Sequence, residues 1–189
     1  MRKIALIFPG VGYTKDRPLL YYAGKLAAHY GYELKFIDFS GLDWSKEKLK
    51  DQDFLQKTLE KCMNMTEGAL KDLGDLSHDR LVFISKSIGT VVATAYAKKK
   101  SLNAEQICFS PLEMIGDHVS EEGAILFCGD DDPYADFASV EKIAKEKRLE
   151  IHRVSGANHS LETGDVFKDI DNMKTMMQRV ADLLANVDA

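Results

Sequence analysis

Ser87 stands where a strand and a helix meet with almost no connecting loop. The run Leu81–Ile84 is apolar and short enough for a buried strand, and from Ile88 onward apolar side chains recur at helical spacing. The chain must therefore reverse direction at Ser87, which strains its backbone and requires small residues two positions away, here Ser85 and Gly89. Such a turn raises the serine hydroxyl above the sheet at a helix N-terminus, where free N–H groups favour developing negative charge. This is the placement of a nucleophile.

A serine hydroxyl becomes an effective nucleophile when an imidazole accepts its proton and a carboxylate orients that imidazole. In parallel sheets, functional residues follow the strands, and two polar loops do so here. Residues 129–134 (GDDDPY) follow one predicted strand, and residues 155–160 (SGANHS) follow the last. His159 lies in a glycine-containing loop directly after a strand. The other histidines lie inside predicted elements or ahead of strands: His29, His78, His118 and His152.

Three consecutive aspartates could supply the carboxylate. Asp132 precedes Pro133, and a proline disfavours helical geometry in the residue before it, so Asp132 is expected to be extended and to point across the sheet edge. Asp132 could also cap a helix that begins at Pro133. We predict Asp132 as the orienting carboxylate, with Asp130 as the second choice. The plain alternative for Ser87 is a helix-capping serine.

The chain order Ser87, Asp132, His159 resembles that of the α/β-hydrolase superfamily, whose nucleophile elbow has the pattern G-x-S-x-G. Ser85 replaces the first glycine of that pattern. The resemblance extends over essentially the whole chain and implies a single α/β-hydrolase domain, residues 1–189. It implies a reduced, mostly parallel sheet of about six strands with helices on both faces.

The connection in which larger members carry a lid is short here, Pro111–Gly123, so no lid domain is expected and the site should be open. Residues 112–115 are expected to form one wall of the site, with Tyr134 nearby. By the same resemblance, the amides of Val11 and Ile88 form the oxyanion hole. The predicted substrate-binding residues are Gly10 and Gly12, which allow close backbone approach, Tyr13, and Lys86, which would favour an anionic substrate.

The remaining elements follow from apolar periodicity and from glycine and proline breaks. Further strands are expected at Lys3–Phe8, Glu33–Asp38, Gln106–Phe109, Ala124–Cys128 and Glu150–Val154. Helices are expected at Arg17–Tyr30, Lys46–Leu73 with a possible break near Gly68, Ile88–Lys100, Pro133–Lys147 and Ile170–Val187.

The overall composition excludes several classes of protein. The 189 residues suit one domain, and the net charge of −5 argues against a nucleic-acid partner. No apolar run reaches the length of a membrane span, and Ile4–Phe8 is too short for a signal peptide, so we expect a cytoplasmic protein without a membrane partner. Cys62, Cys108 and Cys128 lack metal-ligand spacing and are expected to be buried, reduced thiols. No metal and no other cofactor is predicted.

These features predict a serine hydrolase with an acyl-enzyme mechanism, acting on a small soluble carboxylic ester or thioester. One alternative is an amide or short-peptide hydrolase. Another is a non-catalytic binding or regulatory protein on the same scaffold, which the departure at Ser85 would allow. A nucleotide-binding domain is disfavoured because neither a G-x-G-x-x-G motif nor a P-loop follows the first strand. The oligomeric state stays open.

Overall fold

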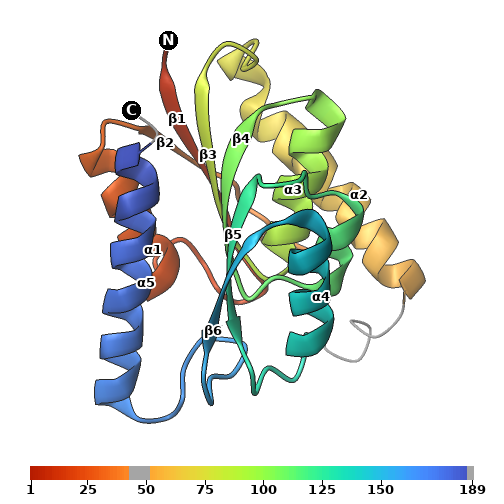
Figure 1. The fold of residues 1–189 in the computed structure, drawn as a ribbon. Coiled ribbons are helices and arrows are strands. Elements are labelled where there is room, and N and C mark those ends of the chain that lie inside the picture. Colours follow the sequence, from red (N-terminus) through yellow and green to blue (C-terminus); the bar gives the residue numbers. More distant parts are fainter. Residues whose placement is uncertain (43–51, 187–189) are drawn as a thin grey trace.

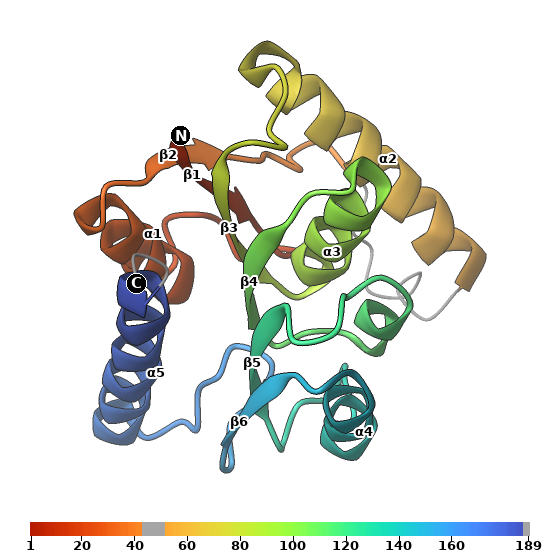
Figure 2. The ribbon, with the colours of Figure 1, turned by 45° about the horizontal axis from the view of Figure 1, so that its top comes forward.

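The computed structural model describes residues 1–42 and 52–186, in which one parallel sheet lies between two layers of helices (Figures 1 and 2). The elements in chain order are β1 (Lys3–Phe8), α1 (Pro18–His29), β2 (Glu33–Phe36), α2 (Gln52–Leu70), η2 (Lys71–Leu73), β3 (Arg80–Lys86), α3 (Ile88–Lys100), β4 (Ala104–Phe109), η3 (Glu113–Asp117), β5 (Ala124–Gly129), α4 (Phe137–Lys147), β6 (Glu150–Val154) and α5 (Val166–Asn186).

The six strands lie in the order β2-β1-β3-β4-β5-β6, and every neighbouring pair is parallel. The inner strands are buried on both faces, which explains why β1 is a continuous apolar run instead of an alternating one. After β1 the chain forms β2 on one side of β1 and then crosses over to form β3 on the other side of β1. The carboxyl ends of β1 and β3 therefore flank the switch point at which such sheets bind ligands. The loop after Phe8 and the turn at Ser87 both lie there.

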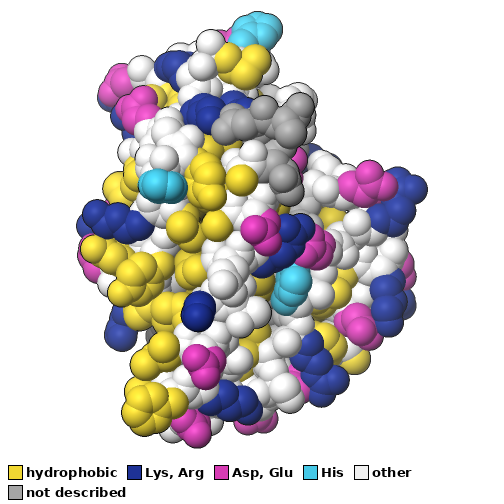
Figure 3. Space-filling view, turned by 60° about the vertical axis from the view of Figure 1, so that its left-hand side comes forward, with side chains coloured by type: hydrophobic (Ala, Val, Ile, Leu, Met, Phe, Trp, Pro, Cys, Tyr) yellow, Lys and Arg dark blue, Asp and Glu magenta, His cyan; other side chains and the backbone are white. Residues whose placement is uncertain are grey.

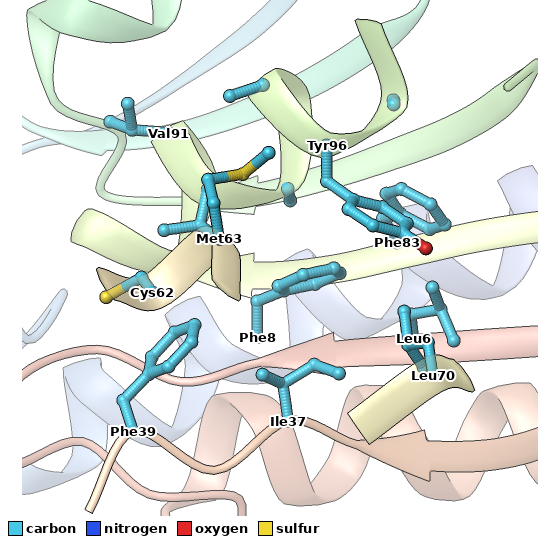
Figure 4. Packing of buried hydrophobic residues seen from close by; sticks show 14 of the residues in the cluster. Leu6, Phe8, Ile37, Phe39, Cys62, Met63, Leu70, Phe83, Val91 and Tyr96 are labelled. Carbon is cyan, nitrogen blue, oxygen red and sulfur yellow. The ribbon is translucent and has the colours of Figure 1, made fainter. Parts of the chain in front are cut away.

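Helices cover both faces of the sheet, as predicted. Helices α1 and α5 pack on one face, while α2, α3 and α4 pack on the other (Figure 1). On the second face, the rings of Phe8 and Phe83 lie 5.3 Å apart between their centroids, and Tyr96 from α3 packs beside them (Figure 4). This apolar layer fixes β1, β3 and α3 relative to one another and so supports the turn that carries Ser87.

The start of α4 differs from the prediction. The helix begins at Phe137 rather than Pro133, and its N-cap is Asp136, whose carboxylate accepts a hydrogen bond from the Ser139 amide at 2.9 Å. Asp132 is therefore not the helix cap. The cap signal that the sequence offers at Asp132-Pro133 recurs at Asp136, four residues later, where the side chain is free to bond the first turn.

Two other helices also differ from their predicted bounds. Helix α2 passes through Gly68 without a break and ends at Leu70; the predicted stretch 46–51 lies outside the described residues. Helix α5 begins at Val166, four residues before the predicted start. Its first turn is exposed on the side of the molecule formed by α1 and α5, where hydrophobic side chains lie among charged ones (Figure 3). Asp165 marks the start of this helix, because its carboxylate accepts hydrogen bonds from the Phe167 and Lys168 amides in the first turn.

The three cysteines are buried and free, as predicted. Burial raises the pKa of the Cys62 and Cys108 thiols to about 12, so both stay protonated at neutral pH. Among residues 1–42 and 52–186, no group of three His, Cys, Asp or Glu side chains is placed to hold a metal ion. None of the helices in those ranges is long and apolar enough to cross a membrane.

Candidate active site

The backbone of Ser87 has φ 55° and ψ −126°, a conformation that residues other than glycine rarely adopt. The reversal between β3 and α3 imposes it, as the sequence predicts. Ser87 occupies the N-cap position of α3, but its side chain makes no capping hydrogen bond. The reading of Ser87 as a helix-capping serine is therefore wrong, and its hydroxyl is available for another partner.

Two small residues permit this turn for different reasons. A Cβ atom added at Gly89 would lie 2.5 Å from the Pro9 carbonyl oxygen, so only glycine lets α3 approach the end of β1 this closely. Ser85 is fully buried, and its hydroxyl donates to the Ile107 carbonyl at 3.2 Å. The sheet thus accommodates a serine at this position without opening the elbow. The departure from the G-x-S-x-G pattern leaves the geometry at Ser87 intact.

Ser87, His159 and Asp132 form one chain of hydrogen bonds. His159 Nε2 lies 2.7 Å from Ser87 Oγ, and His159 Nδ1 lies 2.7 Å from Asp132 Oδ2. With the ring proton on Nδ1, the imidazole donates to Asp132 and its Nε2 can accept the Ser87 hydroxyl proton. The Asp132 side chain is only 3% exposed and the His159 side chain 20% exposed. The carboxylate end of the chain is therefore screened from water, the imidazole is partly accessible, and Ser87 as a whole is 9% exposed.

Asp132 remains ionised in this position. Burial alone would raise the pKa of its carboxyl, but the hydrogen bond from His159 and a second one from the Tyr134 amide, at 2.8 Å, outweigh it. The net effect holds the pKa of Asp132 below its ordinary value. A buried carboxylate of this kind stabilises an adjacent imidazolium.

Asp130, the second choice, lies elsewhere. Its carboxylate accepts a hydrogen bond from the Gly156 amide and forms an ion pair with Arg153, and both contacts lower its pKa. Asp130 thus fastens the loop that follows β6 and does not bond His159. Gly129 lets the same loop lie close to the end of β5, because a Cβ atom there would lie 2.1 Å from the Ala157 carbonyl oxygen.

The loop after β1 lies against the turn at Ser87. Gly10 and Tyr13 exchange two backbone hydrogen bonds, of 3.1 and 3.3 Å, which close a tight turn with Val11 and Gly12 at its tip. A Cβ atom at Gly10 would lie 3.1 Å from the Ser87 Cβ atom, so this glycine does permit a close approach. Gly12 differs: its φ of +65° favours glycine, but its surroundings are open.

Of the two residues predicted for the oxyanion hole, Ile88 directly follows Ser87 and Val11 directly follows Gly10, which lies against Ser87. Ile88 is the first residue of α3, where backbone N–H groups have no partner within the helix. Val11 is brought beside the turn by the contact of Gly10 with Ser87. The structure therefore brings the predicted segments together.

Lys86 is placed differently from the expectation that its charge faces an anionic substrate. Its side chain is 1% exposed, and its Nζ donates to the backbone carbonyl of His159 at 2.6 Å. The Nζ also lies 5.2 Å from the centroid of the Tyr13 ring. The ammonium is therefore buried below the surface of the site. An anion-binding role would require it to be exposed there.

Sequence reasoning missed Ser110. This buried residue follows β4 with φ 45°, and its Oγ donates to the His159 carbonyl at 2.9 Å. Its position directly after a strand was the available signal. Of the residues expected to form a wall of the site, 112–115, Ile115 is instead fully buried in the core. Tyr134 is half exposed, and its ring lies edge-on to the His159 ring at 5.0 Å between centroids.

Comparisons with known proteins identify the fold. No family model and no curated protein matches the sequence. A proposed hydrolase of the α/β superfamily from Xanthomonas campestris superposes with a TM-score of 0.71 at 16% identity, over 98% of this chain and 99% of that one. A lidless α/β serine hydrolase, also from Xanthomonas campestris, gives 0.62 at 16% identity, over 94% and 80%. Est1E from Butyrivibrio proteoclasticus, solved with ferulic acid bound, gives 0.68 at 12% identity, over 97% and 88%.

The chain therefore has the α/β-hydrolase fold, as its sequence pattern implies. Between β4 and β5, where larger members carry a lid, it has only the short helix η3. This confirms the predicted reduced, lidless form.

Proposed function

We propose that this protein is a serine hydrolase in which Ser87, His159 and Asp132 form a catalytic triad. The observation that carries the proposal is the continuous hydrogen-bonded chain from a serine on a strained turn, through an imidazole, to a buried carboxylate. The fold shared with solved α/β hydrolases supports it. A non-catalytic binding protein would not need the serine hydroxyl within 2.7 Å of the imidazole.

In the proposed acylation step, Ser87 Oγ attacks the substrate carbonyl carbon while His159 Nε2 takes the hydroxyl proton. The carbonyl oxygen becomes a tetrahedral oxyanion, which the amides of Val11 and Ile88 stabilise together with the N-terminal dipole of α3. Asp132 holds the ring in the required tautomer and stabilises its positive charge. His159 then gives the proton to the leaving group, and the carbon–leaving group bond breaks.

Deacylation repeats the sequence with water. His159 takes a proton from a water molecule, whose oxygen attacks the acyl carbon. The second tetrahedral intermediate collapses, returning the proton to Ser87 Oγ and releasing the carboxylic acid.

The proposed substrate class is a small carboxylic ester or thioester. Between β4 and β5 the fold has only the short helix η3 and no cap, which favours small substrates over ones that need an enclosing cap. Est1E, with bound ferulic acid, and the lidless serine hydrolase are the neighbours that support this class. Nothing in the geometry favours amides over esters, so matched esters, thioesters and amides of one acyl group would rank the leaving groups.

Covalent labelling with a fluorophosphonate probe, read by intact mass, tests the proposal. We expect one adduct on the wild type and none on Ser87→Ala or His159→Ala. Ser139→Ala, which changes a serine at the start of α4, is the matched control and should label like the wild type. A folded wild-type protein that forms no adduct would refute the proposed activity.

A further inference from the structure

The Lys86 side chain lies buried at the centre of the catalytic edge. Lysine is almost never fully buried unless its ammonium is bound, and here it is the last residue of β3, directly before the proposed nucleophile. Its Nζ donates to the carbonyl oxygen of His159, a residue 73 positions away in the sequence, at 2.6 Å. The residue next to the nucleophile thus holds the main chain of the residue that takes the nucleophile's proton.

The same carbonyl oxygen has a second donor. Ser110 Oγ reaches it at 2.9 Å from the end of β4. A carbonyl oxygen has two lone pairs, so Lys86 and Ser110 together satisfy it. Fixing this oxygen fixes the peptide plane that follows His159 and, with it, the direction in which the ring leaves the backbone.

A third contact joins the Lys86 ammonium to the loop after β1. The ammonium lies 5.2 Å from the Tyr13 ring centroid, within the range of a cation–π interaction. The Tyr13 phenol oxygen in turn accepts a hydrogen bond from the Leu19 amide at 3.2 Å, which fixes the ring against α1. Burial raises the pKa of the Tyr13 phenol, so the ring stays neutral. Lys86 thereby connects the loop that holds Val11 with the loop that holds His159.

The charges around this ammonium are acidic. Asp132 and Glu162 both favour its protonated form, but burial outweighs them and lowers the pKa of Lys86 to about 7. Burying this ammonium against a backbone carbonyl lowers the stability of the folded state. Stability therefore does not explain why a lysine occupies this position.

We propose that Lys86 is a positioning residue that, together with Ser110, holds the main chain of His159 so that the imidazole stays aligned between Ser87 and Asp132. The inference rests on the proposed hydrolase function and adds to it the part of the fold that holds the base in place. A ring displaced by about 1 Å can cost about 100-fold in rate, which sets the scale of the effect.

Lys86→Met tests this, because methionine nearly preserves the length of the side chain and removes both the charge and the donor. We expect the rate of fluorophosphonate labelling and kcat for an ester to fall by about 10- to 100-fold, with KM changed by less than about twofold. The melting temperature should not fall. A role in structure alone would lower the melting temperature and leave the rates of the folded protein unchanged.

Lys98→Met is the matched control. Its Nζ also donates to a backbone carbonyl, that of Asp117 at 2.7 Å, but at the far end of α3. This variant should label and turn over like the wild type.

Ser110→Ala provides a second, milder test that needs no charge removal. Loss of one hydroxyl donor should slow labelling about fivefold, as expected for one hydrogen bond. If Lys86→Met does not fold, this variant still decides the question.

The outcomes separate the two proposals. Wild-type labelling that depends on Ser87, with wild-type rates in both Lys86→Met and Ser110→Ala, would overturn the positioning role and leave the hydrolase proposal standing. Absence of labelling in the folded wild type would instead overturn the hydrolase proposal itself.

Discussion

Replacing the buried Lys86 with methionine should make the protein more stable at and below neutral pH, although we expect it to slow catalysis. In the unfolded chain the ammonium is solvated, with an ordinary pKa of 10.5, whereas burial lowers the pKa in the folded chain to about 7. Below pH 7 the folded state must therefore keep a charge out of water. Above pH 7 the folded state releases that proton while the unfolded state keeps it up to pH 10.5, so stability rises with pH between these values.

The magnitude follows from the two pKa values. Their difference corresponds to about 5 kcal/mol at about 1.4 kcal/mol for each pH unit. Methionine forfeits the hydrogen bond to the His159 carbonyl, worth about 2 kcal/mol for a charged donor, and the contact with the Tyr13 ring, worth about 1 kcal/mol. The expected net gain at pH 6 is therefore about 2 kcal/mol. For a chain of 189 residues this is a rise of about 4 to 8 °C in melting temperature.

Urea unfolding of the wild type, Lys86→Met and Lys98→Met at pH 6 and pH 9.5 measures this difference directly. Lys86→Met should be more stable than the wild type at pH 6 and lose that advantage by pH 9.5, because deprotonation of Lys86 stabilises the folded wild type by about 3.5 kcal/mol between pH 7 and pH 9.5. Lys98→Met should follow the wild type at both pH values. An advantage of equal size at both pH values, or a loss of stability at pH 6, would refute the reasoning that a buried ammonium destabilises the fold.

Three substitutions test other parts of the site. Asp132→Asn should lower kcat by about 10³- to 10⁴-fold with little change in melting temperature, because the amide cannot stabilise the imidazolium; steady-state ester hydrolysis measures this. Asp130→Asn should weaken the ion pair with Arg153 and cost much less in kcat, and a loss as large as that of Asp132→Asn would contradict the assignment of the two carboxylates. Gly89→Ala should destabilise the protein by about 3 kcal/mol in urea unfolding, since its Cβ would lie 2.5 Å from a backbone oxygen; wild-type stability would show that α3 can move away from β1.

The sequence was sufficient to single out Ser87 and His159, the proposed nucleophile and base, because both choices follow from local constraints. A buried strand that runs directly into a helix leaves Ser87 as the residue that must turn the chain. His159 was found by the rule that functional residues follow parallel strands, together with the position of its glycine-containing loop. The strand bounds were predicted well for the same reason, since continuous apolar runs and glycine or proline breaks are visible in one dimension.

The choice between Asp132 and Asp130 lay at the limit of what the sequence allows. The proline argument favoured Asp132, but the capping argument offered for the same residue was wrong, because α4 is capped by Asp136. Only the tertiary structure shows that Asp130 is already bound by Arg153 and the Gly156 amide, while Asp132 reaches the His159 ring.

The contacts of Lys86 and Ser110 with His159 could be learned only from the tertiary structure. The position of Ser110 directly after a strand is a signal that it belongs to the site, but it does not show which group the hydroxyl bonds. For Lys86, an exposed position was the natural expectation. Their shared target is a backbone carbonyl, which every residue possesses and which no sequence pattern marks. The sequence by itself therefore determined which side chains could do chemistry at the carboxyl edge of the sheet. Only the tertiary structure decided how His159 is held there, through Ser110 and Lys86, which lie 49 and 73 positions away in the sequence. The reason is that a side chain bonds whichever partner the fold brings within its reach.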